Sequence, residues 1–125
     1  MSTISVIILG QNVALEIGMS FKTSQFADEI IYVDTFSGST DDTLKIARQY
    51  KAKIVKSPSY NFSDWRNDGA KAANSDWLLY LDSDERLTDK LIAEIKTTID
   101  NPLHSAYTIS RYEVFLGKHL AHWGD

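Results

Sequence analysis

Four short runs of mostly apolar residues recur along the chain, at residues 5–9, 29–33, 52–55 and 77–81. A continuous apolar run of this length is typical of a strand that is buried on both faces, as in a parallel sheet. Each run gives way at once to polar or turn-forming residues, and the second and fourth end directly before Asp34 and Asp82. The runs therefore predict the strands of one buried sheet.

Helical spacing is found between and after these runs, at residues 14–26, 42–50, 64–73 and 89–99. Ser39, Thr40 or Asp41 can cap the second of these helices, and Thr88 can cap the fourth. Because strands and helices alternate, the sequence predicts an α/β fold: a mostly parallel sheet, flanked by helices and connected by right-handed crossovers.

The pattern changes after Pro102. Residues 106–112 alternate between apolar and polar, which predicts a strand, and residues 114–119 have the composition of the start of a turn or hairpin. A length of 125 residues leaves no room for two independent domains. We therefore expect residues 1–125 to form one domain, with a hairpin beginning within 102–125, and we expect the sequence to be the front part of something longer.

The composition excludes several classes of protein. With 13 Lys and Arg against 17 Asp and Glu, the net charge of −4 has the wrong sign for a chain that holds nucleic acid by charge alone. The absence of cysteine excludes disulfides, thiolate metal sites and cysteine nucleophiles. The apolar start at residues 4–9 is too short for a membrane span and lacks the pattern of a signal peptide, so we expect a cytoplasmic protein.

An acidic segment directly follows the fourth apolar run and carries the sharpest chemical signal. Asp82 and Asp84, one residue apart, would place hard oxygen ligands in a strand-end loop, and such ligands suit Mg²⁺ or Mn²⁺. The alternative is an acidic approach to the helix capped by Thr88, which the helix dipole would favour. An EF-hand is excluded because Leu87 stands where its loop needs glycine.

Residues 34–43 form a second polar signal, which combines Asp34, a glycine and a hydroxyl-rich helix start. Asp34 could accept hydrogen bonds from a base or ribose, and the free amides of the helix start could favour phosphate. The alternative is simple turn formation and helix capping. Neither a Gly-x-Gly-x-x-Gly nor a Gly-Lys-Ser/Thr fingerprint is present, which disfavours dinucleotide dehydrogenases and P-loop enzymes.

Four motifs, in this order, resemble the family 2 glycosyltransferases, and most closely the bacterial lipopolysaccharide-core type. They are Ile30-Ile31-Tyr32-Val33-Asp34, Ser37-Gly38-Ser39-Thr40-Asp41-Asp42-Thr43, Arg66-Asn67 and Trp77-Leu78-Leu79-Tyr80-Leu81-Asp82-Ser83-Asp84-Glu85. The resemblance implies the Rossmann-like GT-A fold, here truncated on the acceptor side. It also implies transfer of a sugar from a nucleotide diphosphate sugar, with UDP expected, to an acceptor hydroxyl with inversion at the anomeric carbon.

The same resemblance implies roles for individual residues. Asp34 resembles the carboxylate that contacts the nucleotide, Arg66 the cation near the uracil or phosphates, Asp82 the contact to the ribose or sugar, and Asp84 the ligand of a Mn²⁺ or Mg²⁺ ion. The resemblance also places Ser39 and Asn12 on the nucleotide side, and Asp82 beside the metal. Two departures are Val13, where the family has an acidic residue, and Thr35-Phe36, which looks like an inserted pair. Arg66 could instead be a surface cation, and we expect Tyr60, Phe62 and Trp65 to serve in packing.

Inverting transfer needs a carboxylate base on the acceptor side of the site. The nearest match to the family pattern is Asp125, at the end of Trp123-Gly124-Asp125. The expected acceptors are saccharides or lipid-linked saccharides, with peripheral membrane contact and self-association as further expectations. Two alternatives stay open: a non-catalytic nucleotide-binding or assembly module, and a phosphatase of the haloacid-dehalogenase type.

Overall fold

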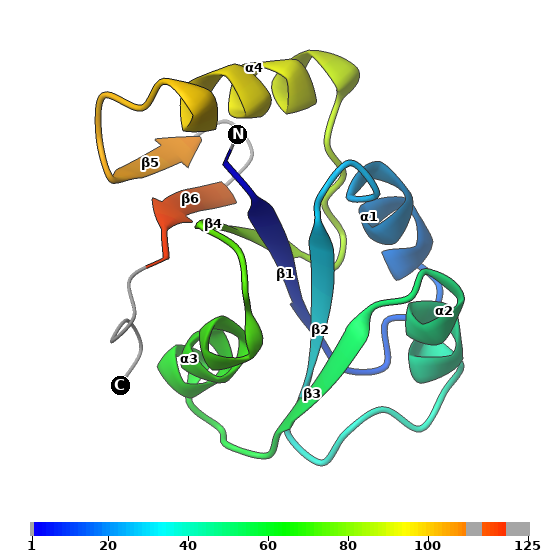
Figure 1. Cartoon of the computed structure of the whole chain (residues 1–125). Helices are drawn as coiled ribbons and strands as arrows, with labels where there is room; N and C mark the ends of the chain where they lie inside the picture. Colours follow the sequence, from blue (N-terminus) through cyan, green and yellow to red (C-terminus); the bar gives the residue numbers. More distant parts are fainter. Residues whose placement is uncertain (1, 110–113, 120–125) are drawn as a thin grey trace.

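A computed structural model describes residues 2–109 and 114–119 of the chain and shows a six-stranded sheet flanked by helices (Figure 1). The strands lie in the order β3-β2-β1-β4-β6-β5. The elements, in chain order, are β1 (Ile4–Gly10), α1 (Ile17–Thr23), β2 (Glu29–Thr35), α2 (Thr43–Gln49), β3 (Lys53–Ser57), α3 (Phe62–Ala72), β4 (Trp77–Asp82), α4 (Asp89–Asp100), β5 (Ala106–Ile109) and β6 (Val114–Lys118).

Strand β1 lies at the centre of the sheet, and residues 4–9 of it are buried. It pairs in parallel with β2 on one side and β4 on the other, and β2 pairs in parallel with β3. The four apolar runs are therefore the four parallel strands, as predicted. The burial of β1, β2 and β4 removes from water the β-branched and aromatic side chains that favour strands, whereas β3, at the end of the strand order, is only partly buried.

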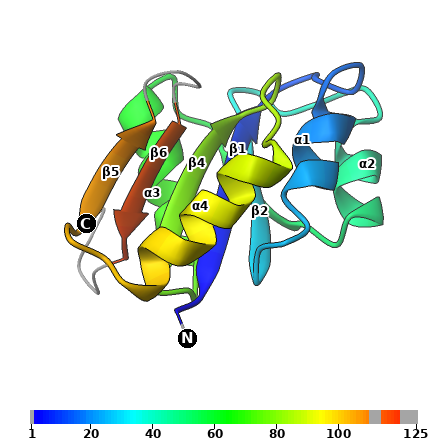
Figure 2. The same ribbon diagram turned by 90° about the horizontal axis from the view of Figure 1, so that it is seen from above.

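Helices α1, α2 and α4 pack on one face of the sheet, and α3 packs on the other (Figure 2). The places of α1, α2 and α3 follow from right-handed crossovers, as predicted. The chain moves outward from β1 to β2 to β3 with α1 and α2 on one face, and then returns from β3 across β2 and β1 to β4. A right-handed connection in the reverse direction must run over the opposite face, which is where α3 lies. The connection from β4 through α4 to β5, which lies parallel to β4, crosses the sheet in the same direction as the β3–β4 connection but over the opposite face, so the predicted right-handedness is wrong there.

The sequence predicts the helices well but not all of their ends. Helix α1 begins at Ile17 instead of residue 14, because Val13 O accepts hydrogen bonds from the amides of Glu16 and Ile17 in a preceding turn. Helix α3 begins at Phe62 because Asn61 caps it through a hydrogen bond from the Ser63 amide. Thr88 caps α4 as predicted, with its side chain accepting from the Leu91 amide at 3.1 Å.

Strands β5 and β6 form an antiparallel pair, and β6 also pairs antiparallel with β4. The strand predicted over residues 106–112 is found at Ala106–Ile109, whereas Val114–Lys118, predicted as the start of a turn or hairpin, form a strand. The later part of the predicted strand, residues 110–112, lies outside the described residues, as do Asp125 and the rest of residues 120–125. No helix in the described part of the chain is long and apolar enough to cross a membrane.

Helix α3 approaches the sheet closely through small residues. Gly69 and Ala70 are its buried positions, and a methyl group added at Gly69 would lie 2.7 Å from a methyl of Ile7 and 3.0 Å from one of Val33. Both contacts are with stiff β-branched side chains of the sheet. The spacing between α3 and the sheet therefore depends on the missing side chain at residue 69.

We expect Gly69→Ala to destabilise the fold by about 1–3 kcal/mol, because the overpacking outweighs the better helix propensity of alanine. Gly18→Ala is the matched control, since a methyl group added to Gly18 in α1 meets no atom within 4 Å. The control should stabilise by roughly 0.5–1 kcal/mol. Urea denaturation of the two variants checks the prediction, and a Gly69→Ala variant as stable as the parent would contradict it.

Candidate functional site

The four parallel strands end at one edge of the sheet, where the polar segments of the sequence meet. The register pairs Gly10 of β1 with Asp34 of β2, and Leu9 of β1 with Asp82 of β4. The two carboxylates therefore flank the end of the central strand, with backbones roughly 10 Å apart, two strand spacings. In open α/β sheets ligands bind outside this edge, at the point where the strand order reverses, here between β1 and β4.

Asp34 is buried at this edge, with only 1% of its surface exposed. Its Oδ2 accepts a hydrogen bond from the Ser39 amide at 2.8 Å, and its Oδ1 accepts from the Ser39 hydroxyl at 2.6 Å and from the Tyr32 hydroxyl at 3.1 Å. Gly38, at φ +89°, passes beside the carboxylate where a side chain would crowd Oδ2. Asp34 thus shapes the loop that follows β2.

Asn12 links the loop after β1 to the loop after β2. Its Oδ1 accepts from the amides of Thr40 and Asp41 at 2.7 and 3.2 Å, and its own amide donates to the Ser39 hydroxyl at 2.9 Å. Asn12 adopts the left-handed conformation, with φ 53°, which asparagine tolerates better than most residues. The structure therefore brings the predicted residues Asn12, Asp34 and Ser39 into one hydrogen-bonded group, which we call the donor loop group.

Asp41 adds a second link between the two loops. Its Oδ2 accepts from the Ala14 amide at 3.1 Å, and its Oδ1 accepts from the amide and hydroxyl of Thr43 at 2.9 and 2.5 Å. The hydrogen bond from the Thr43 hydroxyl, reinforced by these amides, lowers the pKa of Asp41 below its ordinary 3.8. Asp41 therefore holds the start of α2 through Thr43, although the N-cap position itself is Asp42.

The acidic segment after β4 is a tight turn. The Asp82 carbonyl accepts from the Glu85 amide at 3.0 Å, and Glu85 Oε1 accepts from the Asp82 amide at the same distance. Asp82 and Asp84 are exposed on this turn, whereas Leu87 just after it is buried in the core. Glu85 is thus used to close the turn, and the two aspartates that the sequence singles out face solvent.

Arg66 lies on α3 with its guanidinium 4.1 Å from the ring centre of Tyr80, a cation–π contact, and 5.5 Å from that of Phe62. Tyr80 is half-buried on β4, two residues before Asp82, and its hydroxyl donates to the Arg66 carbonyl at 3.4 Å. Burial raises the pKa of Tyr80, and the charge of Arg66 opposes that rise. Arg66 is therefore a half-buried residue stacked on the sheet, in place of the surface cation that the sequence left as an alternative.

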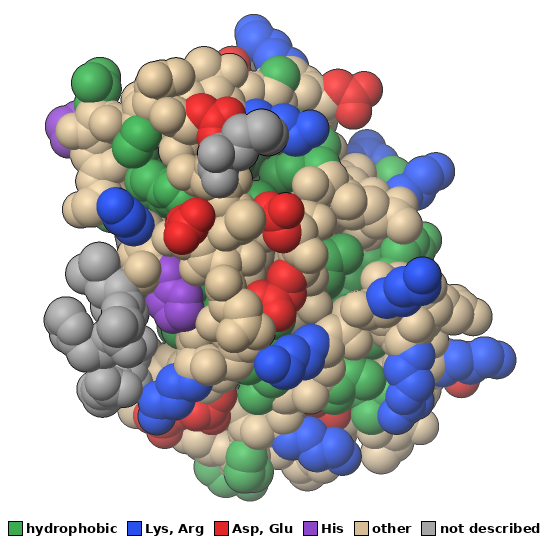
Figure 3. Space-filling view, viewed as in Figure 1, with side chains coloured by type: hydrophobic (Ala, Val, Ile, Leu, Met, Phe, Trp, Pro, Cys, Tyr) green, Lys and Arg blue, Asp and Glu red, His purple; other side chains and the backbone are tan. Residues whose placement is uncertain are grey.

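Beside the loops after β1 and β2 lies a group of aromatic side chains, which the sequence did not predict as a unit. Phe36, which adopts φ 55°, packs its ring against Tyr60 at 5.3 Å and Trp65 at 4.7 Å. Trp65 packs against the core as expected. Tyr60 and Phe62 also pack, against Phe36 and Trp65, but they remain 84% and 51% exposed. The inserted pair Thr35-Phe36 was the signal in the sequence. Figure 3 shows a small hydrophobic patch at the lower end of the face in view, near the loops after β2 and β3.

The predicted residues therefore fall into three parts of one edge: the donor loop group, Arg66 on Tyr80, and the pair Asp82 and Asp84. Within residues 2–109 and 114–119, no group of three or more His, Cys, Asp or Glu side chains is placed to hold a metal ion by itself. Asp125, the predicted base, lies outside the described residues.

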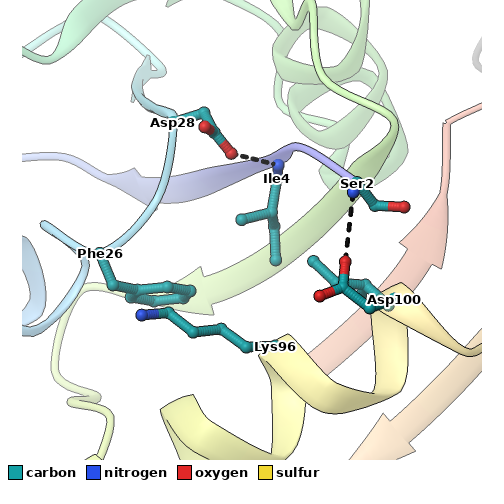
Figure 4. Close-up of a pocket in the computed structure, with 7 residues that line it drawn as sticks. Ser2, Ile4, Phe26, Asp28, Lys96 and Asp100 are labelled. Carbon is teal, nitrogen blue, oxygen red and sulfur yellow. Dashed lines mark hydrogen bonds between the residues drawn. The ribbon is translucent and has the colours of Figure 1, made fainter.

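A separate cavity of about 240 Å³ lies at the opposite edge of the sheet, near the start of β1 (Figure 4). Its acidic groups already serve the backbone, because Asp28 accepts from the Ile4 amide at 2.8 Å and Asp100 from the Ser2 amide at 3.2 Å. Lys96 lies over the ring of Phe26. These contacts hold the start of β1, so the cavity is not a second candidate site.

A model of the family described as "Glycosyl transferase family 2" matches residues 12–125. A TPR repeat-containing protein of Synechococcus elongatus is 38% identical over 92 residues, which are 73% of this chain and 22% of that protein. An uncharacterized glycosyltransferase of Rickettsia felis is 35% identical over 97 residues, 77% of this chain and 34% of that protein. The chain thus spans between a fifth and about a third of the length of these relatives.

Solved structures show the same fold. S. aureus TarS 1-349 in complex with UDP-GlcNAc superposes with a TM-score of 0.70 at 23% identity, over 85% of this chain and 33% of that one. Glucosyl-3-phosphoglycerate synthase from Mycobacterium tuberculosis, in complex with Mn²⁺, UDP and glucosyl-3-phosphoglycerate, superposes with a TM-score of 0.64 at 16% identity, over 94% of this chain and 57% of that one. The sheet and its flanking helices are therefore the GT-A arrangement, and the chain corresponds to part of those longer chains.

We expect Asp34→Asn to destabilise the chain by about 1–3 kcal/mol, because an amide NH₂ would face the donors of Ser39 or Tyr32 and leave a buried group unsatisfied. Asp42→Asn is the control, since Asp42 is exposed and its side chain makes no capping hydrogen bond. Urea denaturation measures both, and equal midpoints for the two variants would show that Asp34 does not organise the loop.

The lowered pKa of Asp41 gives a prediction on pH. A carboxylate whose pKa is lower in the folded than in the unfolded chain stabilises the fold above its unfolded pKa, and this stabilisation is lost as the pH falls through the folded pKa. The amide NMR shifts of Ala14 and Thr43 should therefore titrate together, with a midpoint below 3.8. Asp41→Asn should abolish that titration, and a midpoint above 3.8 would contradict the contacts described.

Proposed function

Since the chain belongs to glycosyl transferase family 2, we propose that it binds a UDP-sugar at the carboxyl edge of its sheet and serves the transfer of that sugar to an acceptor hydroxyl. Family membership supports glycosyl transfer. The choice of UDP is supported by neighbours of the same fold, whose structures contain UDP-GlcNAc or UDP. The single observation that carries the proposal is the exposed aspartate pair on a closed turn beside the strand-order reversal.

Asp82 and Asp84 fit Mn²⁺ or Mg²⁺. Such ions are commonly held by one or two carboxylates and complete their coordination with water and substrate phosphate oxygens, so two exposed aspartates suffice where no third ligand is at hand. When bound, the ion would neutralise the diphosphate and so stabilise it as a leaving group. The Mn²⁺ in the synthase complex supports this assignment.

We place the nucleotide on the donor loop group and the diphosphate within reach of Arg66. Both oxygens of Asp34 are engaged by Ser39 and Tyr32, so the contribution of Asp34 to nucleotide binding is first to fix the loop that faces the base. The Arg66 guanidinium is held in place by its stacking on Tyr80, which lowers the ordering entropy that an anion contact would cost.

The proposed transfer inverts the anomeric centre. A carboxylate on the acceptor side then removes the proton of the acceptor hydroxyl as the new bond forms. Asp125 stays our candidate for this base. A likeness to lipopolysaccharide-core enzymes, a saccharide or lipid-linked acceptor, membrane contact and self-association stay predictions that rest on the motifs alone.

Calorimetry of UDP binding, with MnCl₂ or with EDTA, tests the proposal. We expect tighter binding with Mn²⁺, and we expect Asp84→Asn to remove the difference between the two conditions. Glu94→Gln is the matched control, because it neutralises one exposed carboxylate on α4 and should leave the difference intact.

Two results would contradict the proposal. Equal UDP affinity with and without Mn²⁺ in the parent chain would remove the metal role of Asp82 and Asp84. A thermal-shift screen in which no nucleotide diphosphate sugar raises the Tm would overturn donor binding itself.

A further inference from the structure

The acidic turn after β4 rests on helix α1 through one buried hydroxyl. Ser20 is fully buried, and its Oγ lies 3.2 Å from the carbonyl oxygen of Asp82 and 3.0 Å from that of Ser83. A third carbonyl, that of Glu85, also accepts from it. Three backbone carbonyls of the turn therefore converge on the side chain of a residue more than sixty positions earlier in the chain.

Losing such a hydrogen bond destabilises a fold by more than forming it stabilises the fold. A buried hydroxyl without an acceptor destabilises the fold, so Ser20 keeps a carbonyl of the turn within reach. The hydroxyl has one hydrogen and three acceptors around it, so the contact survives small shifts of any one carbonyl. Ser20 thus fixes the backbone of the turn from the side of the core.

Thr23 holds the other end of the same segment. It lies one helical turn after Ser20, on the same face of α1. Its Oγ1 accepts from the Leu87 amide at 3.0 Å and donates to the Met19 carbonyl at 2.9 Å. Leu87 itself is buried in the core. Helix α1 therefore fixes both the carbonyls of the turn and the amide that follows it.

The two aspartates of the turn differ from its buried contacts with α1. Asp82 and Asp84 are exposed, while the backbone that carries them is held from beneath by α1. We infer that Ser20 is a positioning residue of the donor site, which orders the Asp82–Glu85 turn so that its two aspartates meet the cation and diphosphate in one geometry. This inference rests on the proposed function. Preorganised ligands bind more tightly because less conformational entropy is lost on binding.

The test compares Ser20→Ala with Ser24→Ala in the chain as it stands. Ser24 is an equally matched control, because it too is fully buried next to α1, and its hydroxyl donates only to the Ser20 carbonyl, at 2.7 Å. Amide hydrogen exchange of residues 82–87 and the UDP affinity in MnCl₂ are measured for both. Ser20→Ala should speed exchange in the turn and weaken Mn²⁺-dependent UDP binding about tenfold, whereas Ser24→Ala should do neither.

Thr23→Val serves as a second variant should Ser20→Ala not fold, and it should also speed exchange at Leu87 and weaken UDP binding in Mn²⁺. The inference would be overturned if amide exchange and UDP affinity stayed unchanged in Ser20→Ala or Thr23→Val. It would also be overturned if Ser24→Ala lost as much protection and affinity as they do. The exchange measurement needs no ligand. It therefore decides whether Ser20 orders the turn even where the parent chain shows no effect of Mn²⁺, a result that would count against the proposed function instead.

Discussion

The pairing of β1 with a parallel strand on each side is the constraint on which the structure depends. It buries the central strand completely and sets the register that brings Asp34 and Asp82 to either side of its end. The right-handed crossovers among β1, β2, β3 and β4 then place α1 and α2 on one face of the sheet and α3 on the other. Every group assigned to the candidate site is attached to an element whose place follows from this arrangement.

The carboxyl edge of the sheet carries polar groups that tie the loops together and, beside them, two exposed aspartates. Asn12, Asp34 and Asp41 direct their oxygens at backbone amides of neighbouring loops, and Glu85 does so within its own turn. Asp82 and Asp84 are exposed on that turn. Because each loop is tied to another element, the exposed carboxylates are carried on a fixed frame, as binding sites require.

The sequence predicted the four parallel strands and their alternation with four helices, because apolar runs and helical spacing report burial directly, but it did not predict β6 as a strand. It also predicted which residues meet at the edge. It could not show that the oxygens of Asp34 accept hydrogen bonds from Ser39 and Tyr32, nor that Tyr60 and Phe62 are exposed. Both features depend on contacts between loops distant in sequence. The role of Ser20 was invisible for the same reason: an isolated serine within an amphipathic helix has no pattern of its own.

The close approach at Gly69 has a consequence for how such a domain can diversify. Arg66 lies three residues before Gly69 on α3, so the depth at which the helix sits on Ile7 and Val33 also sets how far the guanidinium extends past Tyr80. A substitution in the core can therefore change how far the Arg66 guanidinium extends at the carboxyl edge of the sheet. No substitution is needed among the residues proposed to bind the sugar donor. Under the proposed function, a substitution in the core that changes how α3 packs would alter which donor the site prefers.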